Sequence, residues 1–316
     1  MRPHALIAVN AFSDLHMKRI GEALSGWATW ERIDEAASDD IYVPALSRSD
    51  IAVGWPKADH VFASNLKLLQ SGSVGYDGYL GRNWSSKPTF TYCNAKGVMS
   101  IAVAEQFVAM MMGLTRRIPQ HVRDMGERLW QRAETYDEVY GTTALIVGIG
   151  DIGTEIARRC LGLGMNVIGV RRNTEEQHSF IKEVYGVHDL KKVIGLADHI
   201  VLILPGGNGT DQLFDADIFA AMKPGAYFYN LARGSIVDES ALYNALATNH
   251  LSGAGLDVFA VEPLPAESPL WSLHNVIIMP HSGGRSVREF DRMCDLFIAN
   301  AYNFRDDKPY VNPIRL

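Results

Sequence analysis

The sequence predicts an α/β protein made of two doubly wound domains, and three observations support this fold class. Short apolar segments alternate with helical patterns along the whole chain, which is typical of parallel sheets flanked by helices. The apolar run 144–147 leads directly into a glycine-rich segment, and a helical pattern follows from Glu155. The length of 316 residues suits two domains of ordinary size.

The first part of the chain predicts a small parallel sheet followed by a long helix. Its candidate strands are 6–9, 51–54, 66–70 and 89–92. Residues 100–114 form a continuous apolar pattern that predicts a helix, and the charged and aromatic segment 116–140 is expected to be a connection.

The second part of the chain predicts a complete doubly wound unit of six strands. These are 143–147, 166–170, 199–204, 227–230, 254–258 and 276–279. Asp238 marks a helix start, and 287–304 has the apolar spacing of a closing helix. A single helix cannot bury its apolar face alone, so this last one should pack against one of the two domains.

We therefore expect two Rossmann-like or flavodoxin-like domains with parallel sheets and a cleft between them. Residues 98–280 would form a dinucleotide-binding domain. Residues 1–97 together with 281–316 would form a discontinuous substrate-binding, catalytic domain. Clefts between domains are common sites for small ligands.

The glycine-rich segment has the spacing of a dinucleotide fingerprint. Gly148 permits the tight turn from strand to helix, Gly150 lets a pyrophosphate approach the backbone, and Gly153 lets helix and strand pack closely. Asp151 and Ile152 begin the helix, whose first N–H groups and partial positive charge favour phosphate. The segment predicts a site for NAD or NADP.

The end of the next strand indicates which dinucleotide is preferred. A carboxylate about twenty residues past the glycines usually binds the ribose hydroxyls of NAD. This chain has Arg171 and Arg172 there instead, and a guanidinium can bind the 2′-phosphate of NADP. We expect NADP(H) to be preferred and NAD(H) to be possible. The alternative is that both arginines are solvated loop residues.

Composition and charge exclude several classes of function. A formal charge of −6 does not favour capture of nucleic acid or anionic membranes. No window approaches eighteen apolar residues, and the N-terminal apolar run is too short for a signal peptide. Three cysteines without a C-x-x-C pair fit a reducing compartment. We expect a cytoplasmic protein with no metal.

Polar residues follow the candidate strands where parallel strands end at one sheet edge. Pro205 follows the third strand of the second series, and Arg233 follows the fourth. Asp257 closes the fifth strand, Glu262 lies just beyond it, and His281 follows the sixth strand. Ligands of open α/β sheets bind at the carboxyl ends of the strands. Singly, these residues could be a helix cap, a turn carboxylate or a solvated loop arginine, but their convergence favours catalysis.

From about residue 60 onward, the chain resembles the D-isomer-specific 2-hydroxyacid dehydrogenases. The resemblance rests on ordered short motifs. These are 73–77 (SVGYD), 102–105 (AVAE), 148–154 (GIGDIGT), 222–225 (MKPG), 230–234 (NLARG), 256–259 (LDVF), 262–265 (EPLP), 268–271 (SPLW) and 280–281 (PH).

The resemblance implies roles for three catalytic residues. Arg233 would bind the substrate carboxylate and polarise its carbonyl group. His281 would donate a proton to the nascent alkoxide and remove it in the reverse direction. Glu262 would accept from the other ring nitrogen and favour the imidazolium.

The same resemblance implies binding residues. The backbone amides of Val74 and Gly75, with Arg233 and His281, would bind substrate. Asp257 would meet the nicotinamide carboxamide, and Leu231 and Ala232 would line the nicotinamide groove. The full expected cofactor set is Gly148, Gly150, Asp151, Ile152, Gly153, Arg171, Arg172, Pro205, Leu231, Ala232, Asp257 and Gly283.

The implied activity is hydride transfer from NADPH to C2 of a small 2-oxo acid, giving the D-2-hydroxy acid. Glyoxylate or hydroxypyruvate is the first expectation. The alternatives are a related dehydrogenase for another small acid, or a cofactor-sensing, corepressor-like protein without activity. The resemblance also implies a homodimer formed through 100–114 and the arm that follows.

Some side chains near the expected pocket have no assigned role. Trp55, Tyr76, Trp130 and Met279 could shape the substrate pocket or could simply be core residues. Arg285 is expected near a helix start, where a cation needs a compensating partner. That partner could be an acidic residue across the cleft or an anionic part of the substrate.

Overall fold

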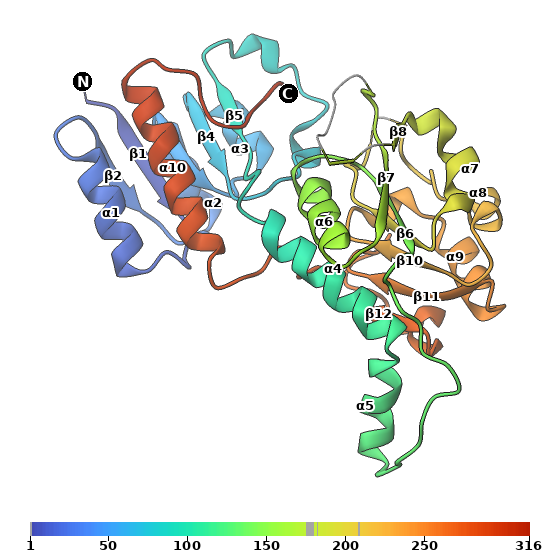
Figure 1. Ribbon diagram of the computed structural model, residues 1–316. Coiled ribbons are helices and arrows are strands. Elements are labelled where there is room, and N and C mark those ends of the chain that lie inside the picture. The colour runs from blue at the N-terminus through green and yellow to red at the C-terminus, as the bar shows by residue number, and fades with distance from the viewer. Residues whose placement is uncertain (1, 175–179, 182, 208) are drawn as a thin grey trace. The chain divides into compact units, whose positions relative to one another are not determined.

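The computed structural model describes residues 2–174, 180–181, 183–207 and 209–316. The chain divides into two compact units (Figure 1). Unit 1 comprises Met1–Met99 and Ser286–Leu316, and unit 2 comprises Ser100–Arg285. Each unit has a mainly parallel sheet covered by helices, so the predicted α/β class is confirmed.

The sheet of unit 1 has six strands in the order β13-β5-β4-β3-β1-β2. Its strands are β1 (His4–Ala8), β2 (Thr29–Arg32), β3 (Ile51–Gly54), β4 (Leu68–Ser71), β5 (Thr91–Cys93) and β13 (Pro313–Ile314). All neighbours are parallel except β13, which pairs antiparallel with β5. The order of β1 to β5 is the flavodoxin-like one.

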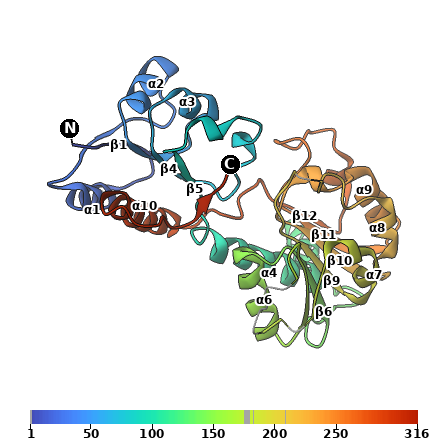
Figure 2. The same cartoon turned by 90° about the horizontal axis from the view of Figure 1, so that it is seen from above.

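Helices cover both faces of this sheet. They are α1 (Asp14–Leu24), α2 (Asp39–Ser47), α3 (Ala58–Ala63) and α10 (Glu289–Arg305), with short 3-10 helices η1 (Asp77–Tyr79) and η2 (Trp84–Ser86). Figure 2 shows α1 and α10 on one side of the sheet and α2 and α3 on the other. Leu6 packs on the α2 side and Ile7 on the α1 side, because successive strand side chains alternate. Phe297 of α10 is fully buried, so the closing helix completes unit 1.

Within the described residues, the sheet of unit 2 has seven parallel strands in the order β12-β11-β10-β9-β6-β7-β8. They are β6 (Thr143–Val147), β7 (Asn166–Val170), β8 (Glu183–Tyr185), β9 (His199–Leu202), β10 (Ala226–Asn230), β11 (Leu251–Leu256) and β12 (Val276–Ile278). The strand order reverses between β6 and β9, which is where doubly wound folds bind dinucleotides.

The helices of unit 2 also form two layers. They are α4 (Ser100–Thr115), α5 (Ile118–Gly126), α6 (Asp151–Gly162), α7 (Leu190–Val193), α8 (Ala216–Ala221) and α9 (Glu239–Ala247), with 3-10 helices η3 (Val187–Asp189), η4 (Ile194–Leu196), η5 (Gly234–Ile236) and η6 (Pro269–Ser272). In Figure 2, α4 and α6 lie on one face of the sheet and α7, α8 and α9 lie on the other. The second face buries the larger apolar core, with Phe214, Phe219 and Phe228 in mutual contact.

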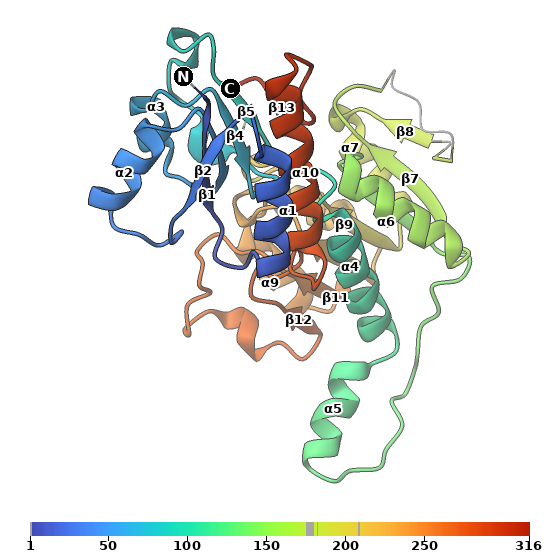
Figure 3. The same cartoon turned by 90° about the vertical axis from the view of Figure 1, so that its left-hand side faces the viewer.

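The sequence suggested that segment 116–140 is only a connection, but it also contains a helix. It contains α5, which extends away from the sheet of unit 2 (Figures 1 and 3). Apolar side chains of α5 remain exposed, with Val122 at 59% and Met125 at 75%. A short helix with so little buried surface has a weak apolar signal in a window dominated by charged residues.

Three strands were not predicted, and all of them lie at or beside a sheet edge. β2 is a sheet edge whose side chains are mostly exposed, so it has no apolar run. β8 and β13 are also edges and have only three and two residues. Edge strands bury little side-chain surface, so periodicity does not reveal them.

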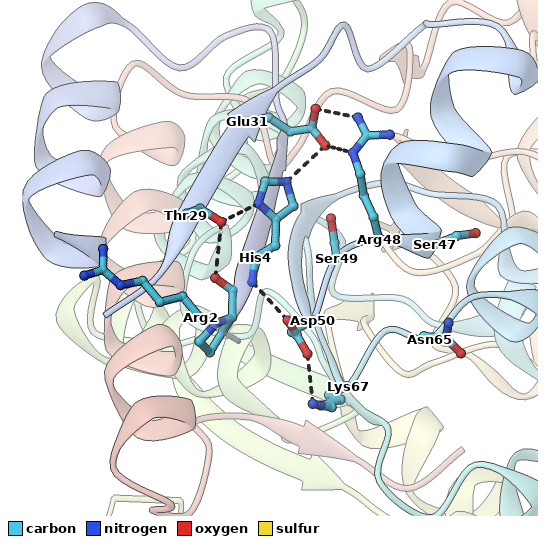
Figure 4. A pocket seen from close by; sticks show the side chains of 11 residues that line it. Arg2, His4, Thr29, Glu31, Ser47, Arg48, Ser49, Asp50, Asn65 and Lys67 are labelled. Carbon is cyan, nitrogen blue, oxygen red and sulfur yellow. Dashed lines mark hydrogen bonds and ion pairs between the residues drawn. The ribbon is translucent and has the colours of Figure 1, made fainter. Parts of the chain in front are cut away.

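Unit 1 has a polar cavity of about 770 Å³ at the amino ends of β1 to β4 (Figure 4). His4 bridges Thr29 at 2.8 Å and Glu31 at 3.1 Å, and Arg48 binds both oxygens of Glu31. Asp50 accepts from the His4 backbone N–H at 2.9 Å and pairs with Lys67. These groups satisfy one another, so the cavity wall ties neighbouring strands together.

Candidate active site

The glycine loop of unit 2 has the shape that a dinucleotide needs. A Cβ on Gly148 would lie 2.7 Å from the Ile203 backbone, and one on Gly153 would lie 2.1 Å from the Gly148 carbonyl. A Cβ on Gly150 would meet nothing within 4 Å. Gly148 and Gly153 are therefore required by packing, whereas Gly150 faces open space that a pyrophosphate could fill.

The helix α6 that follows this loop has Gly150 as its N-cap. Its first N–H groups, including those of Asp151 and Ile152, have no acceptor within the helix and favour an anion. The Asp151 carboxylate is bound by the hydroxyl of Ser100, at the start of α4. The backbone N–H of Asp151 is therefore available to a phosphate, while its side chain links α6 to α4 through the Ser100 hydroxyl.

Arg171 and Arg172 directly follow β7, next to the glycine loop in the sheet order. The backbone N–H of Arg171 donates to the Tyr185 carbonyl of β8, which fixes the strand end. Arg171 is half-buried and Arg172 is exposed. No acidic side chain occupies this strand end within residues 171–174, so the position has the charge suited to a 2′-phosphate.

Arg233 lies in the turn after β10. Its side chain is half-buried, and Nη1 donates to the Ala232 carbonyl at 2.7 Å. Leu231 and Ala232, which precede it, are buried at 7% and 4% exposure. Pro205, which follows β9, is exposed, and its carbonyl accepts from the Thr210 hydroxyl at 3.2 Å.

Gly234 brings the Arg233 turn against the segment that carries Glu262. A Cβ at Gly234 would lie 1.8 Å from the carbonyl carbon of Phe259, so only glycine permits this contact. The Phe259 N–H in turn donates to Glu262 Oε1 at 3.0 Å. Two loops from neighbouring strands therefore meet through their backbones.

Glu262 and His281 form a hydrogen-bonded pair. Glu262 Oε2 lies 2.7 Å from His281 Nδ1, with side-chain exposures of 35% and 51%. Among the described residues, His281 Nε2 has no hydrogen-bond partner. The carboxylate thus orients the ring and leaves the second nitrogen available to a ligand, which is the geometry of a general acid–base.

The charge around Glu262 favours its ionised form. Burial alone would raise the pKa of this carboxyl group. The hydrogen bonds from His281 and the Phe259 N–H, with the charges of His281 and Arg233, outweigh burial and lower the pKa below its ordinary value of 4.5. Arg233 is therefore close enough to Glu262 to act on its charge.

Asp257 holds the backbone of the histidine loop. Its carbonyl accepts from the His281 N–H, and its two carboxylate oxygens accept from the N–H groups of Ser282 and Gly283, all at 2.9 Å. His281 has φ 50°, which is unusual for a residue other than glycine and needs such support. A Cβ on Gly283 would lie 2.8 Å from Asp257 Oδ2, so Gly283 makes this approach possible.

The Asp257 contacts also keep residues 281–285 in unit 2. The sequence placed the boundary after residue 280, whereas unit 2 extends to Arg285. The first residue of α10 is Glu289, so Arg285 lies shortly before the helix, near its start as expected. His281, Glu262 and Arg233 therefore belong to one compact unit.

The expected substrate residues of unit 1 follow β4. The Val74 carbonyl accepts from Asn94 Nδ2 at 2.9 Å, and the Gly75 carbonyl accepts from the Tyr92 hydroxyl at 3.5 Å. In the part of the chain that the structure describes, their backbone N–H groups have no partner. Both amides therefore remain available as donors.

The four candidate pocket residues have different environments. Trp55 is 40% exposed, and its ring occupies the space where a Cβ on Gly72 would lie. Tyr76 packs partly against the apolar core between the sheet of unit 1 and helices α2 and α3. Met279 directly follows β12 and is half-buried. Trp130 is fully exposed in the segment that follows α5.

Sequence reasoning did not link Asn230 or Gly206 to Arg233, although both lie beside it. Asn230 Nδ2 donates to the Arg233 carbonyl, and a Cβ on Gly206 would touch the Arg233 stem. Asn230 ends β10, and Gly206 follows β9. Their positions at the ends of central strands were the signal in the sequence that could have indicated a role near Arg233.

Across the described residues, no helix has the length and apolarity needed to span a membrane. Over the same residues, no cluster of three or more His, Cys, Asp or Glu side chains could hold a metal ion.

A family model described as "D-isomer specific 2-hydroxyacid dehydrogenase, NAD binding domain" matches residues 108–283. The chain is 32% identical over 252 residues to glyoxylate reductase of Korarchaeum cryptofilum, covering 77% of this chain and 74% of that protein. It is 33% identical over 258 residues to D-3-phosphoglycerate dehydrogenase of Archaeoglobus fulgidus, covering 80% of this chain. The match covers 48% of that second relative, so the chain spans about half its length.

Among solved structures, the fold is similar to an NADPH-dependent glyoxylate/hydroxypyruvate reductase from Sinorhizobium meliloti, determined in complex with citrate. The TM-score is 0.80 at 26% sequence identity, over 99% of this chain and 98% of that one.

Proposed function

Since the chain belongs to the D-isomer-specific 2-hydroxyacid dehydrogenase family, we propose that it reduces a small 2-oxo acid to the D-2-hydroxy acid with NADPH. The family and the glycine loop together define the cofactor as NAD(P). When bound, this cofactor supplies or accepts the hydride. The residues of unit 2 that we propose as catalytic, Arg233, Glu262 and His281, polarise the substrate and move the proton.

The pair formed by Glu262 and His281 carries this proposal. Because Glu262 binds Nδ1, His281 presents Nε2 and can donate a proton to the oxygen that becomes the alcohol. The ionised Glu262 stabilises the imidazolium form needed for that donation. In the reverse direction, the same nitrogen accepts the proton from the hydroxyl group.

Arg233 would bind the substrate carboxylate and polarise the 2-oxo group. Its guanidinium offers several donors in a fixed plane that matches a carboxylate. We also propose that the backbone amides of Val74 and Gly75 bind the carboxylate. Asp257 would meet the nicotinamide carboxamide, and Gly283 would contribute to cofactor binding. The buried Leu231 and Ala232 would line the nicotinamide groove.

A substrate panel tests the activity. Glyoxylate, hydroxypyruvate, pyruvate and phenylpyruvate are each offered with NADPH, and oxidation is followed at 340 nm. We expect turnover with at least one of the small acids and formation of the D-enantiomer where the product is chiral. Cofactor binding without turnover of any 2-oxo acid would instead indicate a cofactor-sensing protein.

The preference for NADPH rests on Arg171, Arg172 and the lack of a carboxylate at residues 171–174. Relatives with a similar fold include an enzyme described as NADPH-dependent. Comparison of kcat/KM for NADPH and NADH tests the preference, and Arg171→Asp should move it toward NADH. An enzyme that already favours NADH would contradict this part of the proposal.

We further propose a cytoplasmic homodimer. The exposed apolar side chains of α5, such as Val122 and Met125, need a covering surface. The three cysteines are unpaired and buried, in keeping with a reducing compartment. Light scattering on wild type and on Met125→Glu tests the dimer, because a charge in that surface should favour the monomer.

A further inference from the structure

Asn230 is the last residue of β10 and is only 2% exposed. Its side chain uses both ends of its amide within the turn that leads to Arg233. Oδ1 accepts from the Ala232 N–H at 3.0 Å, and Nδ2 donates to the Arg233 carbonyl at 3.1 Å. One planar group therefore fixes both peptide units that flank Ala232 and Arg233.

The backbone around Asn230 is fixed by the two neighbouring strands. The Leu231 N–H donates to the Leu202 carbonyl of β9 at 3.1 Å, and the Asn230 carbonyl accepts from the Asp257 N–H beyond β11 at 2.9 Å. Through the Asn230 amide, the Arg233 turn is therefore hydrogen-bonded to a residue that is itself fixed in the centre of the sheet. Sites supported by central strands are held more precisely than sites on free loops.

Gly206 leaves room for the side chain of Arg233. A Cβ on Gly206 would lie 3.1 Å from Arg233 Cγ and 3.4 Å from Arg233 Cβ. Gly206 does not have a positive φ, unlike Gly207 and Gly209 in the same loop. Alanine could therefore adopt the backbone at 206. Its methyl group would press on the arginine stem and lie at an ordinary contact distance of 3.6 Å from Ser235 Oγ.

We propose that Asn230 and Gly206 are positioning residues for Arg233. Asn230 fixes the backbone from which the side chain departs, and Gly206 leaves room for its stem. Together they determine where the guanidinium meets the substrate carboxylate. This inference rests on the proposed function, in which Arg233 binds that carboxylate.

Asn230→Asp tests the backbone part of the inference. Aspartate keeps an acceptor for the Ala232 N–H but turns a carboxylate oxygen toward the Arg233 carbonyl, and the repulsion should displace the turn. A displacement of about 1 Å in a substrate-positioning group can cost roughly a hundredfold. We expect the dissociation constant of oxamate, a non-reducible 2-oxo acid analogue, to rise at least about tenfold in the NADPH-bound enzyme. NADPH binding should change less than oxamate binding.

Asn275→Asp is the matched control. Asn275 is also buried in unit 2, at 6% exposure, and its Nδ2 donates to the Leu246 carbonyl. It precedes β12 at the amino end of that strand, opposite the proposed site. The same chemical change there should lower the melting temperature and leave oxamate affinity at the wild-type value. Equal losses of affinity in both variants would mean a general structural effect and overturn the inference.

Gly206→Ala provides a second variant in case Asn230→Asp does not fold. It adds no charge, and we expect weaker oxamate binding and a higher KM for the 2-oxo acid. Arg233→Lys is the reference for the proposed function. If Arg233→Lys binds oxamate like wild type, the role of Arg233 itself is wrong. If it binds oxamate weakly while Gly206→Ala and Asn230→Asp bind it normally, only the positioning inference fails.

Discussion

Two histidine–glutamate pairs lie at opposite strand ends in the two units. His281 and Glu262 follow the carboxyl ends of β12 and β11 in unit 2, with 2.7 Å between Nδ1 and Oε2. His4 and Glu31 lie at the amino end of β1 and on β2 in unit 1, with 3.1 Å between Nε2 and Oε1. The two pairs have similar chemistry and different surroundings.

The difference lies in what each pair leaves available. Both ring nitrogens of His4 are engaged, and Arg48 occupies both oxygens of Glu31. Within the described residues, Nε2 of His281 has no partner, and its side chain is 51% exposed against 22% for His4. A pair whose donors and acceptors are all satisfied stabilises a fold. A pair with one nitrogen left over can exchange a proton with a ligand.

The largest expected difference is between His281→Ala and His4→Ala. Loss of a general acid–base costs about 10²–10⁴ in rate, so kcat of His281→Ala should fall by that factor. His4→Ala should keep its kcat and lower the melting temperature, because it breaks the contacts to Thr29 and Glu31. NADPH oxidation at 340 nm and thermal unfolding measure the two effects. A fully active His281→Ala would remove the basis for contrasting the pairs.

Glu262→Gln should have the next largest effect. A hydrogen bond to a charged group contributes about 1.5–3 kcal/mol. At about 1.4 kcal/mol per factor of ten, its loss corresponds to a roughly 10- to 100-fold lower kcat. Without the carboxylate that accepts from Nδ1, the His281 ring is held less firmly, so kcat should fall while NADPH affinity stays at the wild-type value. An unchanged kcat would show that His281 does not need Glu262 for its orientation.

Asp257→Asn and Asp50→Asn form the third comparison. Asp257 fixes the strained His281 backbone, whereas Asp50 binds the His4 N–H and Lys67. Leaving a buried donor unpaired costs about 1–3 kcal/mol, so both variants should be less stable. Only Asp257→Asn should also lower kcat, and by less than Glu262→Gln. Equal kcat in both variants would mean that the histidine loop holds its position without this carboxylate.

The smallest effect is expected for Glu31→Gln. The hydrogen bonds from Arg48, supported by His4, hold the pKa of Glu31 below its ordinary value of 4.5, although burial opposes this. The ionised pair therefore stabilises unit 1 above that pH, and its contribution is lost as the pH falls through the lowered value. A partly exposed pair of this kind is worth about 1 kcal/mol or less. Urea unfolding of wild type and variant should differ near neutral pH and converge in acid, and a difference that grows in acid would contradict this sign.

Much of the fold followed from local patterns. The strands Thr143–Val147 and Asn166–Val170 and the helix over 100–114 were predicted almost to the residue, because central elements bury continuous apolar runs. The family was also predicted from motifs and is confirmed. The edge strand β2 and the projecting helix α5 were not predicted, since they bury too little surface to give an apolar pattern.

By itself, the sequence determined the α/β class, the nucleotide-binding loop and the set of polar residues at strand ends. Each depends on neighbours in the chain: strand, glycines and helix are consecutive, and a strand end is visible from its own residues. Only the tertiary structure decided the partners of those polar groups. Asp151 binds Ser100, Asp257 holds the Ser282 and Gly283 backbone, and the Asn230 amide spans the turn to Arg233. These partners depend on the directions of side chains and on how closely two loops approach each other, as at Gly234 and Phe259. The periodicity of a local sequence contains no information on either.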